Sequence, residues 1–189
     1  GYTMHNHACP IEGANGFFLN VCDSNKTREF IREFSPDIII HTAGITDVDF
    51  CEKNPELAWR VNTTGTKNVV EGAEEVGSAV VFYSTSFVFD GTKEGYVPHD
   101  EPNPLNVYGE TKFAAEKMVR QSEAPGLILR TDQPFGWSEK WQAETMLEWV
   151  LNQLIRNEPF PVFQDWCNCP TFIDDLVQMT LSLAMNEQR

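Results

Sequence analysis

The sequence has few basic residues, with 14 lysines and arginines against 28 aspartates and glutamates in 189 residues. Its formal net charge of −14 repels nucleic-acid phosphates and offers no basic patch to an anionic membrane surface. We therefore expect neither a nucleic-acid partner nor a membrane partner. The charge does not exclude a small anionic ligand, because such a ligand needs only a local group of hydrogen-bond donors.

The sequence also lacks any apolar run close to the roughly 18 residues that a membrane span requires. Its start, GYTMHNHACP, has no basic segment followed by an apolar core, so it is not a signal peptide. The 5 cysteines are odd in number and scattered, which argues against a disulfide framework. We expect a cytoplasmic protein. The start lacks Met as well, so we expect the natural chain to begin earlier.

No metal site is expected from the sequence. His5, His7 and Cys9 alternate near the start, but a zinc site needs a fourth ligand and usually pairs its cysteines differently. We interpret this stretch as a polar loop. Cys167 and Cys169 have no second cysteine pair, so we interpret them as structural.

Short, fully apolar segments alternate with amphipathic ones along the chain. The apolar segments 37–44, 78–86 and 127–130 are typical of buried strands. The amphipathic segments predict helices that begin after a cap at Asp23-Ser24 and that cover 54–76, 103–119, 143–156 and 173–185. This alternation predicts an α/β fold with a doubly wound parallel sheet. The length suits one domain, residues 1–189.

Small and hydroxylated residues follow the predicted strands. In a doubly wound sheet, ligands bind outside the carboxyl ends of the strands. Small side chains let a flat ligand lie on the strand ends, and hydroxyls supply donors and acceptors. These positions are Asp23, Thr42-Ala43-Gly44, Ser84-Thr85-Ser86 and Thr131-Asp132.

The stretch NPLNVYGETKFAAEKMV, residues 103–119, places Tyr108 four residues before Lys112, on one face of a helix. A tyrosine titrates near pH 10, and a neighbouring ammonium lowers that pKa by stabilising the phenolate. A hydroxyl from a strand end, here Thr85, can hold a carbonyl against the phenol. The three residues together make a proton donor for carbonyl reduction. Taken alone, the Tyr-x-x-x-Lys spacing is more often a half-exposed tyrosine and a solvated lysine.

Several segments resemble one known family over nearly the whole chain. They are YSTSFVFDG (83–91), EPNPLNVYGETKFAAEK (101–117), HTAGITDVDFCEKNPELAWRVNTTGTKNVV (41–70), LRTDQPFG (129–136) and CPTFIDDL (169–176). Together they resemble the extended short-chain dehydrogenase/reductases, and the branch similar to dTDP-4-dehydrorhamnose reductase in particular. The resemblance implies a Rossmann-like domain that binds NAD(P)H.

The resemblance also implies site residues. The catalytic residues would be Thr85, Tyr108 and Lys112, where Tyr108 donates the proton and Lys112 lowers its pKa and holds the nicotinamide ribose. Asn62 matches a helix asparagine near the active site that is often structural. The implied cofactor-binding residues are Asp23, Thr42, Ala43, Gly44, Tyr108, Lys112 and Thr131. The implied substrate-binding residues are Thr46, Val48, Asp49, Thr85 and Ser86.

The sequence departs from the family pattern in three places. The first strand and its Gly-rich turn, which seats a diphosphate on a helix N-terminus, are absent. The sugar-binding region that follows the last predicted helix in the family is absent too. We therefore expect a domain that is incomplete at both ends, with a gap in the centre of its sheet. The third departure is Ser86-Phe87 after Thr85, where the reductases usually have Asp-Tyr.

The resemblance implies an NAD(P)H-dependent reductase of a nucleotide-linked keto sugar. A second possibility is an epimerase or dehydratase of nucleotide sugars, although Ser86 lacks the acid that dehydratases usually need. A third is a non-catalytic regulatory subunit similar to the β subunit of methionine adenosyltransferase. The family often forms dimers, so a homodimer is an expectation. NAD and NADP are not distinguished by the sequence.

Overall fold

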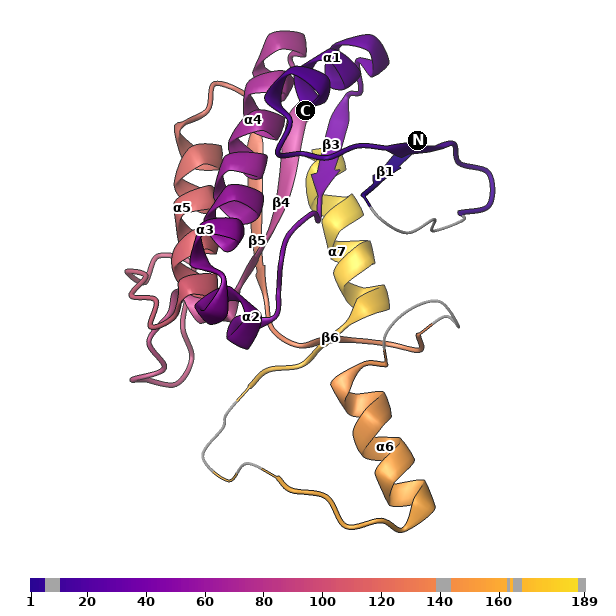
Figure 1. Cartoon of the computed structure of the whole chain (residues 1–189), viewed down its shortest axis with the longest axis vertical. Coiled ribbons are helices and arrows are strands. Elements are labelled where there is room, and N and C mark those ends of the chain that lie inside the picture. The colour runs from indigo at the N-terminus through magenta and orange to yellow at the C-terminus, as the bar shows by residue number, and fades with distance from the viewer. Residues whose placement is uncertain (6–10, 139–143, 163, 165–167, 187–189) are drawn as a thin grey trace. The chain divides into compact units, whose positions relative to one another are not determined.

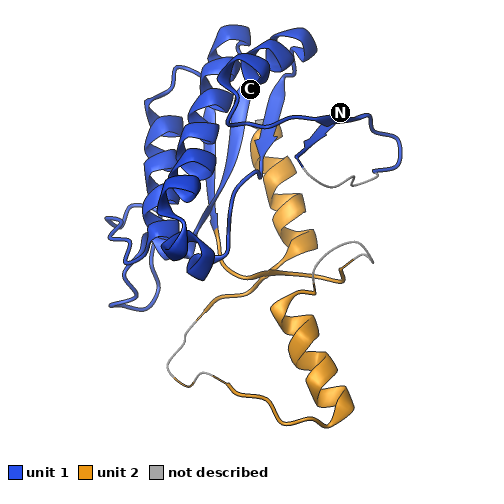
Figure 2. Ribbon diagram, viewed as in Figure 1, with its two compact units in different colours: residues 1–130 blue, residues 131–189 orange. Residues whose placement is uncertain are grey.

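The computed structural model describes residues 1–5, 11–138, 144–162, 164 and 168–186. The chain forms two units, residues 1–130 and residues 131–189 (Figure 2). The first contains the sheet and the helices that carry most of the implied site residues. That the whole chain is one NAD(P)-binding domain stays a prediction.

Three strands form the main sheet of the first unit, in the order β3-β4-β5 (Figure 1). β3 (Ile38–His41) pairs in parallel with β4 (Ala79–Thr85), with Ile38 opposite Ala79 and His41 opposite Phe82. β5 (Gly126–Thr131) lies on the other side of β4. All three fall within the segments for which the sequence predicted buried strands, apart from one residue at each end of β5.

Two short strands near the N-terminus form a separate parallel pair. β1 (Tyr2–Met4) pairs with β2 (Gly16–Phe18), and neither strand joins β3-β4-β5 within the described residues. Phe17 of β2 packs against Phe30 and Phe34 of the following helix. The described strands of the first unit thus form a pair and a separate group of three. That the sheet has a gap in its centre stays a prediction.

One face of the main sheet is covered by α4 (Gly65–Val76) and α5 (Val107–Gln121), which pack against each other and against β4 (Figure 1). Phe82 of β4 is 1% exposed and packs with Val70 of α4 and Ala115 of α5. Burying a side chain of this size stabilises a fold by roughly 1.5–3 kcal/mol. This apolar cluster fixes the helix that carries Tyr108 and Lys112 to the sheet.

The helix predicted over 54–76 is present but is not uniform. It consists of α3 (Pro55–Ala58), a π-helical segment η1 (Trp59–Thr64) and α4, and it ends at Gly77, whose φ of 72° is left-handed. A shorter helix, α2 (Val48–Lys53), precedes it. π-Helical turns are rare and frequently mark functional sites. This one contains Asn62.

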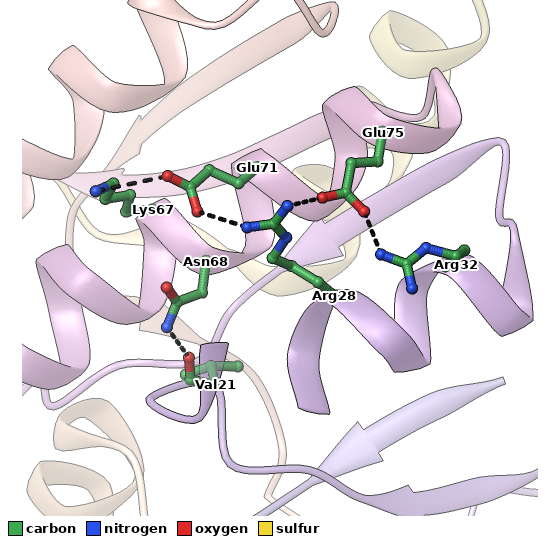
Figure 3. Close-up of polar contacts among 7 residues, drawn as sticks. All are labelled: Val21, Arg28, Arg32, Lys67, Asn68, Glu71 and Glu75. Atoms are coloured by element: carbon green, nitrogen blue, oxygen red, sulfur yellow. Dashed lines mark hydrogen bonds and ion pairs between the residues drawn. The ribbon is translucent and has the colours of Figure 1, made fainter. Parts of the chain in front are cut away.

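α1 (Ser24–Phe34) packs along α4, and charged side chains lie on the exposed side of the contact (Figure 3). Glu75 accepts hydrogen bonds from Arg28 and, at 2.8 Å, from Arg32, and these bonds lower its pKa. Beneath them the buried Asn68 donates from Nδ2 to the carbonyl of Val21 at 2.8 Å. Exposed ion pairs stabilise a fold little, so we assign the packing mainly to buried groups.

The second unit contains a short parallel pair and two helices. β6 (Pro134–Phe135) pairs with β7 (Thr171–Phe172), which leads into α7 (Ile173–Asn186). α6 (Met146–Arg156) begins with a capping box between Thr145 and Glu148. The Glu148 carboxylate also accepts from the Ser138 backbone, and these hydrogen bonds lower its pKa to about 2. No helix in the described part of the chain is long and apolar enough to cross a membrane.

Candidate active site

Thr85 and Tyr108, which are far apart in the sequence, meet at the carboxyl end of β4. Thr85 is the last residue of β4, and Tyr108 lies in the first turn of α5. The Thr85 hydroxyl lies close enough to Tyr108 to lower the pKa of the phenol, and both residues are buried, at 5% and 8% exposure. The structure therefore brings together two of the three residues that the resemblance implies as catalytic.

The start of α5 is held in place by two side chains. Asn106 caps the helix, because its Oδ1 accepts from the Gly109 amide at 2.8 Å. Glu52 of α2 accepts from the Val107 amide at 2.7 Å. A carboxylate at this position also interacts favourably with the positive end of the helix dipole. Tyr108 thus stands in a helical turn that is anchored on both sides.

Tyr108 lies in an apolar setting, which decides the direction of its pKa. Its ring packs edge-on against Phe87 at 5.8 Å and lies in a cluster with Cys51 and Ala58. Burial raises the pKa of Tyr108, the Thr85 hydroxyl lowers it, and the nearby Cys51 raises it further. The net direction is upward, so the neutral phenol is favoured. A neutral phenol is the form that can donate a proton.

Lys112 lies one turn further along α5 and points at the sheet. Its Nζ donates to the carbonyl of Tyr83 at 2.6 Å and sits 4.1 Å from the centre of the Phe82 ring. Burial lowers the pKa of Lys112 to about 8, and the charge of Glu116 opposes that shift. The lowering of the Tyr108 pKa that we expected from Lys112 is not found in this structure. The physical reason is that burial of the phenol outweighs the effects that lower its pKa.

The residues implied to bind the cofactor lie at strand and helix ends. Thr42, Ala43 and Gly44 follow β3 directly and are exposed. Asp23 is the N-cap of α1, where its side chain accepts from the Lys26 amide, and these interactions lower its pKa. That these small, exposed residues bind a flat ligand stays a prediction. Thr131 ends β5 in the second unit, and its buried hydroxyl has no hydrogen-bond partner among the described residues.

Asn62 connects the segment after β3 to α5. Its Oδ1 accepts from the Ile45 amide at 2.7 Å, and its Nδ2 donates to the Ile45 carbonyl and to Thr111 Oγ1, each at 3.0 Å. A Cβ on Gly44 would lie 3.2 Å from Asn62 Oδ1, which is tighter than most contacts of this kind. Asn62 is 1% exposed, and its amide is fully used. The structural interpretation of this asparagine agrees with these contacts.

The residues implied to bind the substrate are spread over the segment that leads into α2 and over the end of β4. Thr46 and Asp49 are exposed, and Val48 is half-buried against the apolar cluster around Tyr108. Ser86 starts a short 3-10 turn, η2 (Ser86–Val88), directly after Thr85. Val48 and Thr85 therefore approach Tyr108, while the other positions are not linked to it by a described contact.

Sequence reasoning missed three polar residues of this region: His41, Glu52 and Glu116. His41 was included in a strand but given no role. Glu116 could have been found from the sequence, because it lies four residues after Lys112 and therefore on the same helix face. Glu52 had no local signal, because its partner Val107 lies in a distant segment.

His41 predicts a pH dependence of stability. It is 4% exposed, stacks on Phe82 and donates from Nε2 to Thr66 Oγ1 at 3.0 Å, since the Thr66 hydroxyl hydrogen is used on the Asn62 carbonyl. Burial, and then the charge of Lys112, lowers its pKa to about 4. The unfolded chain takes up this proton near pH 6.5, and the folded chain does not until about pH 4. Stability should therefore fall by about 3 kcal/mol over that interval.

Urea unfolding at pH 7, 6 and 5 measures this dependence. We expect His41→Gln to flatten the loss of stability between pH 6.5 and 5, whatever its own stability is. His99→Gln is the matched control, because His99 is exposed and should keep the wild-type slope. An unchanged slope in His41→Gln would show that His41 does not remain neutral in the fold.

Among the described residues, no group of three or more His, Cys, Asp or Glu side chains is placed to hold a metal ion. His7, Cys9 and Cys167, which entered the metal interpretation, lie outside the described residues. His5 and Cys169 are described and exposed. The absence of a metal site stays a prediction for the chain as a whole.

A parallel sheet with helices on its face, a strand ending in threonine and a helix with Tyr-x-x-x-Lys define a Rossmann-like protein of the short-chain dehydrogenase/reductase type. Residues 5–189 match the family model described as RmlD substrate binding domain. The chain belongs to this family. The family that the sequence resembles is thereby confirmed.

Two curated relatives and one solved structure illustrate the likeness. The chain is 36% identical over 163 residues to dTDP-4-dehydrorhamnose reductase of Escherichia coli, covering 84% of this chain and 53% of that protein. It is 34% identical over 185 residues to methionine adenosyltransferase 2 subunit beta of Bos taurus, covering 96% of this chain and 55% of that protein. The crystal structure of dTDP-4-dehydrorhamnose reductase from Bacillus anthracis, in complex with NADP, superposes with a TM-score of 0.84 at 30% identity, covering 90% of this chain and 61% of that one.

This likeness confirms the predicted fold class, an α/β Rossmann-like fold with parallel sheets. The chain spans 57% and 50% of the length of two further curated relatives, so it corresponds to about half of such proteins. What the whole relatives do is therefore carried to this chain only as a proposal.

Proposed function

We propose that this chain is the nucleotide-binding part of an NAD(P)H-dependent reductase that acts on a nucleotide-linked keto sugar. The observation that carries the proposal is that the buried side chains of Thr85 and Tyr108 lie close enough to interact, with Lys112 one turn further along the same helix. Supporting it are relatives named as dTDP-4-dehydrorhamnose reductases, one of them in complex with NADP.

In this proposal, each residue of the trio has one task. Tyr108, kept neutral by burial, donates its proton to the carbonyl oxygen of the sugar. The Thr85 hydroxyl holds that oxygen against the phenol. The Lys112 ammonium binds the nicotinamide ribose. The reduced nicotinamide supplies the hydride.

The remaining site residues hold the two ligands. Thr42, Ala43 and Gly44 form a small, exposed ledge after β3 that fits the adenosine and diphosphate part of a dinucleotide. Asp23 and Thr131 complete the proposed cofactor residues. Thr46, Val48, Asp49 and Ser86 are proposed to face the sugar. We expect the protein to act in the cytoplasm and to form a homodimer.

A second function is favoured by one observation. The chain is 34% identical to a relative named as a subunit of methionine adenosyltransferase 2. This proposal makes the protein a partner of another enzyme that need not turn over a sugar. Thr85, Tyr108 and Lys112 do not decide between the two proposals, because a regulatory subunit can keep them.

Titration of the natural full-length protein with NADPH and NADH, followed by a turnover assay with dTDP-4-dehydrorhamnose, tests the reductase proposal. We expect tight binding of one reduced cofactor and its oxidation when the sugar is added. Binding without turnover on keto-sugar nucleotides would favour the regulatory proposal. Failure to bind either cofactor would reject both the cofactor site and the reductase.

A further inference from the structure

Glu116 is a buried carboxylate that the proposed mechanism does not use. It is 0% exposed and lies on α5, four residues after Lys112 and eight after Tyr108. The three side chains therefore share one face of the helix. A buried carboxylate costs several kcal/mol unless it is paired and hydrogen-bonded. Because Glu116 shares a helix face with Tyr108 and Lys112, we ask whether it also influences these two residues.

Two arginines pair with Glu116. Arg130 of β5 donates from Nε to Oε1 at 2.8 Å and from Nη2 to Oε2 at 2.7 Å, which is a bidentate pair. Arg120 donates to Oε2 at 3.0 Å. The Arg130 side chain is 13% exposed and that of Arg120 is 48% exposed, so Arg130 is the less screened partner. The Glu116–Arg130 pair thus fastens α5 to β5.

Arg130 also contacts the loop that joins β4 to α5. Its guanidinium lies 4.8 Å from the centre of the Phe89 ring, and Nη1 donates to the carbonyl of Pro98 at 3.4 Å. Asp90 ties the same loop together by accepting from Tyr96 Oη at 2.6 Å and from Asn103 Nδ2 at 2.9 Å. The loop leads from Thr85 to Tyr108. The Glu116–Arg130 pair therefore joins α5, β5 and the loop that leads from Thr85 to Tyr108.

The charges around Lys112 come from several elements. Glu116 on its own helix is the negative charge, and it raises the pKa of Lys112 against the effect of burial. His41 on β3 is neutral near pH 7, because burial and Lys112 lower its pKa. β4 contributes the Tyr83 carbonyl, and Tyr108 is a neutral phenol. Arg130 and Arg120 stand behind Glu116 and partly neutralise it.

We propose that Glu116 is a positioning residue for the proposed reductase: paired with Arg130 of β5, it holds α5 in the register that presents Tyr108 and Lys112, and it supplies a negative charge one turn from the Lys112 ammonium on the same helix face. This inference deepens the proposed function and rests on it for the role of Lys112. The coupling between Glu116 and Lys112 is itself a property of the folded chain. It can be measured without substrate or cofactor.

The test is an NMR titration of the Lys112 side chain in protein labelled with ¹³C-lysine, assigned with Lys112→Arg. We expect Glu116→Gln to lower the pKa of Lys112 by about one unit, since it removes the nearby negative charge. We expect Arg130→Met to raise that pKa, because it leaves the Glu116 charge less neutralised. Glu110→Gln is the control for net charge, since Glu110 is exposed on the same helix and should change nothing.

If Glu116 acts through its charge, the Lys112 pKa should shift in opposite directions in Glu116→Gln and Arg130→Met. If Glu116 acts only through packing, both variants break the same contact and should shift that pKa in the same direction. An unchanged Lys112 pKa in folded Glu116→Gln, or shifts of the same sign in both variants, would overturn the proposal. If either variant does not fold, Arg120→Gln is measured by itself, because the half-exposed Arg120 neutralises Glu116 only in part and the Arg130 pair remains to hold the buried carboxylate. It should raise the Lys112 pKa by a few tenths of a unit, and no rise would overturn the proposal.

The two proposals fail in different ways. If the wild-type protein shows no turnover, the reductase proposal is rejected, but the Lys112 titration can still be measured and interpreted. If the wild-type protein is active but Glu116→Gln leaves the Lys112 pKa unchanged, only the positioning role of Glu116 is rejected.

Discussion

Tyr108→Phe should lower turnover on a keto-sugar nucleotide by about a thousandfold, because removal of a positioned general acid typically costs 10²–10⁴ in rate. The affinity for NADPH should change little, since Phe keeps the ring that packs on Phe87 and the apolar cluster with Cys51. The fold should also be kept, because only the phenol hydroxyl, which lies near Thr85, is lost. Steady-state kinetics and a cofactor titration of the same sample measure both effects.

Tyr2→Phe is the matched control for this experiment. Tyr2 lies in β1, away from the end of β4, so its variant should keep wild-type kinetics. Turnover that stays within a few-fold of wild type in Tyr108→Phe would reject Tyr108 as the proton donor. A parallel loss of cofactor binding would show instead that the ring had moved.

Gly109→Ala should destabilise the protein by about 3 kcal/mol or more, although Ala in a helix is usually better than Gly by 0.5–1 kcal/mol. Gly109 follows Tyr108 in the first turn of α5. A Cβ there would lie 2.2 Å from the carbonyl oxygen of Phe87 and 3.0 Å from Cβ of Pro104. The Phe87 atom belongs to the backbone, so the helix itself would have to move. Urea unfolding measures the change in the free energy of unfolding.

Gly65→Ala is the control that distinguishes the contact between Gly109 and the Phe87 backbone from the general effect of replacing a helical glycine by alanine. Gly65 is also a buried helical glycine, but its Cβ would meet the end of the Val21 side chain at 2.8 Å, and a side chain can shift. We expect Gly65→Ala to change stability by less than about 1 kcal/mol, as the gain in helix propensity offsets the crowding. Equal effects in the two variants would contradict the close approach of α5 to the turn after Thr85.

Most elements were predictable because their signals are local. The runs 37–44 and 78–86 are apolar and bounded by turn residues, and they became β3 and β4. Gly77 ends its helix in a left-handed conformation, which glycine adopts without strain. The first turn of α5 was less predictable, since Asn106 caps it while Glu52 supports it from another segment.

The π-helical segment of 59–64 was missed because helical periodicity does not distinguish it from an α-helix. Its Asn62 is bonded to Ile45 and to Thr111, and neither contact can be read from sequence spacing. The direction of the Tyr108 pKa was missed for a similar reason. The Tyr-x-x-x-Lys spacing indicates a nearby ammonium, but it does not say how deeply the phenol is buried.

The sequence by itself determined that the chain is an α/β protein with Tyr108 and Lys112 on one helix face and Thr85 at a strand end, because strand and helix periods are local properties of the chain. The tertiary structure alone decided that Thr85 meets Tyr108, that Lys112 reaches the Tyr83 carbonyl, and that Glu116 is paired with Arg130. These contacts join separate segments, and the burial that sets each pKa depends on all the elements packed around it.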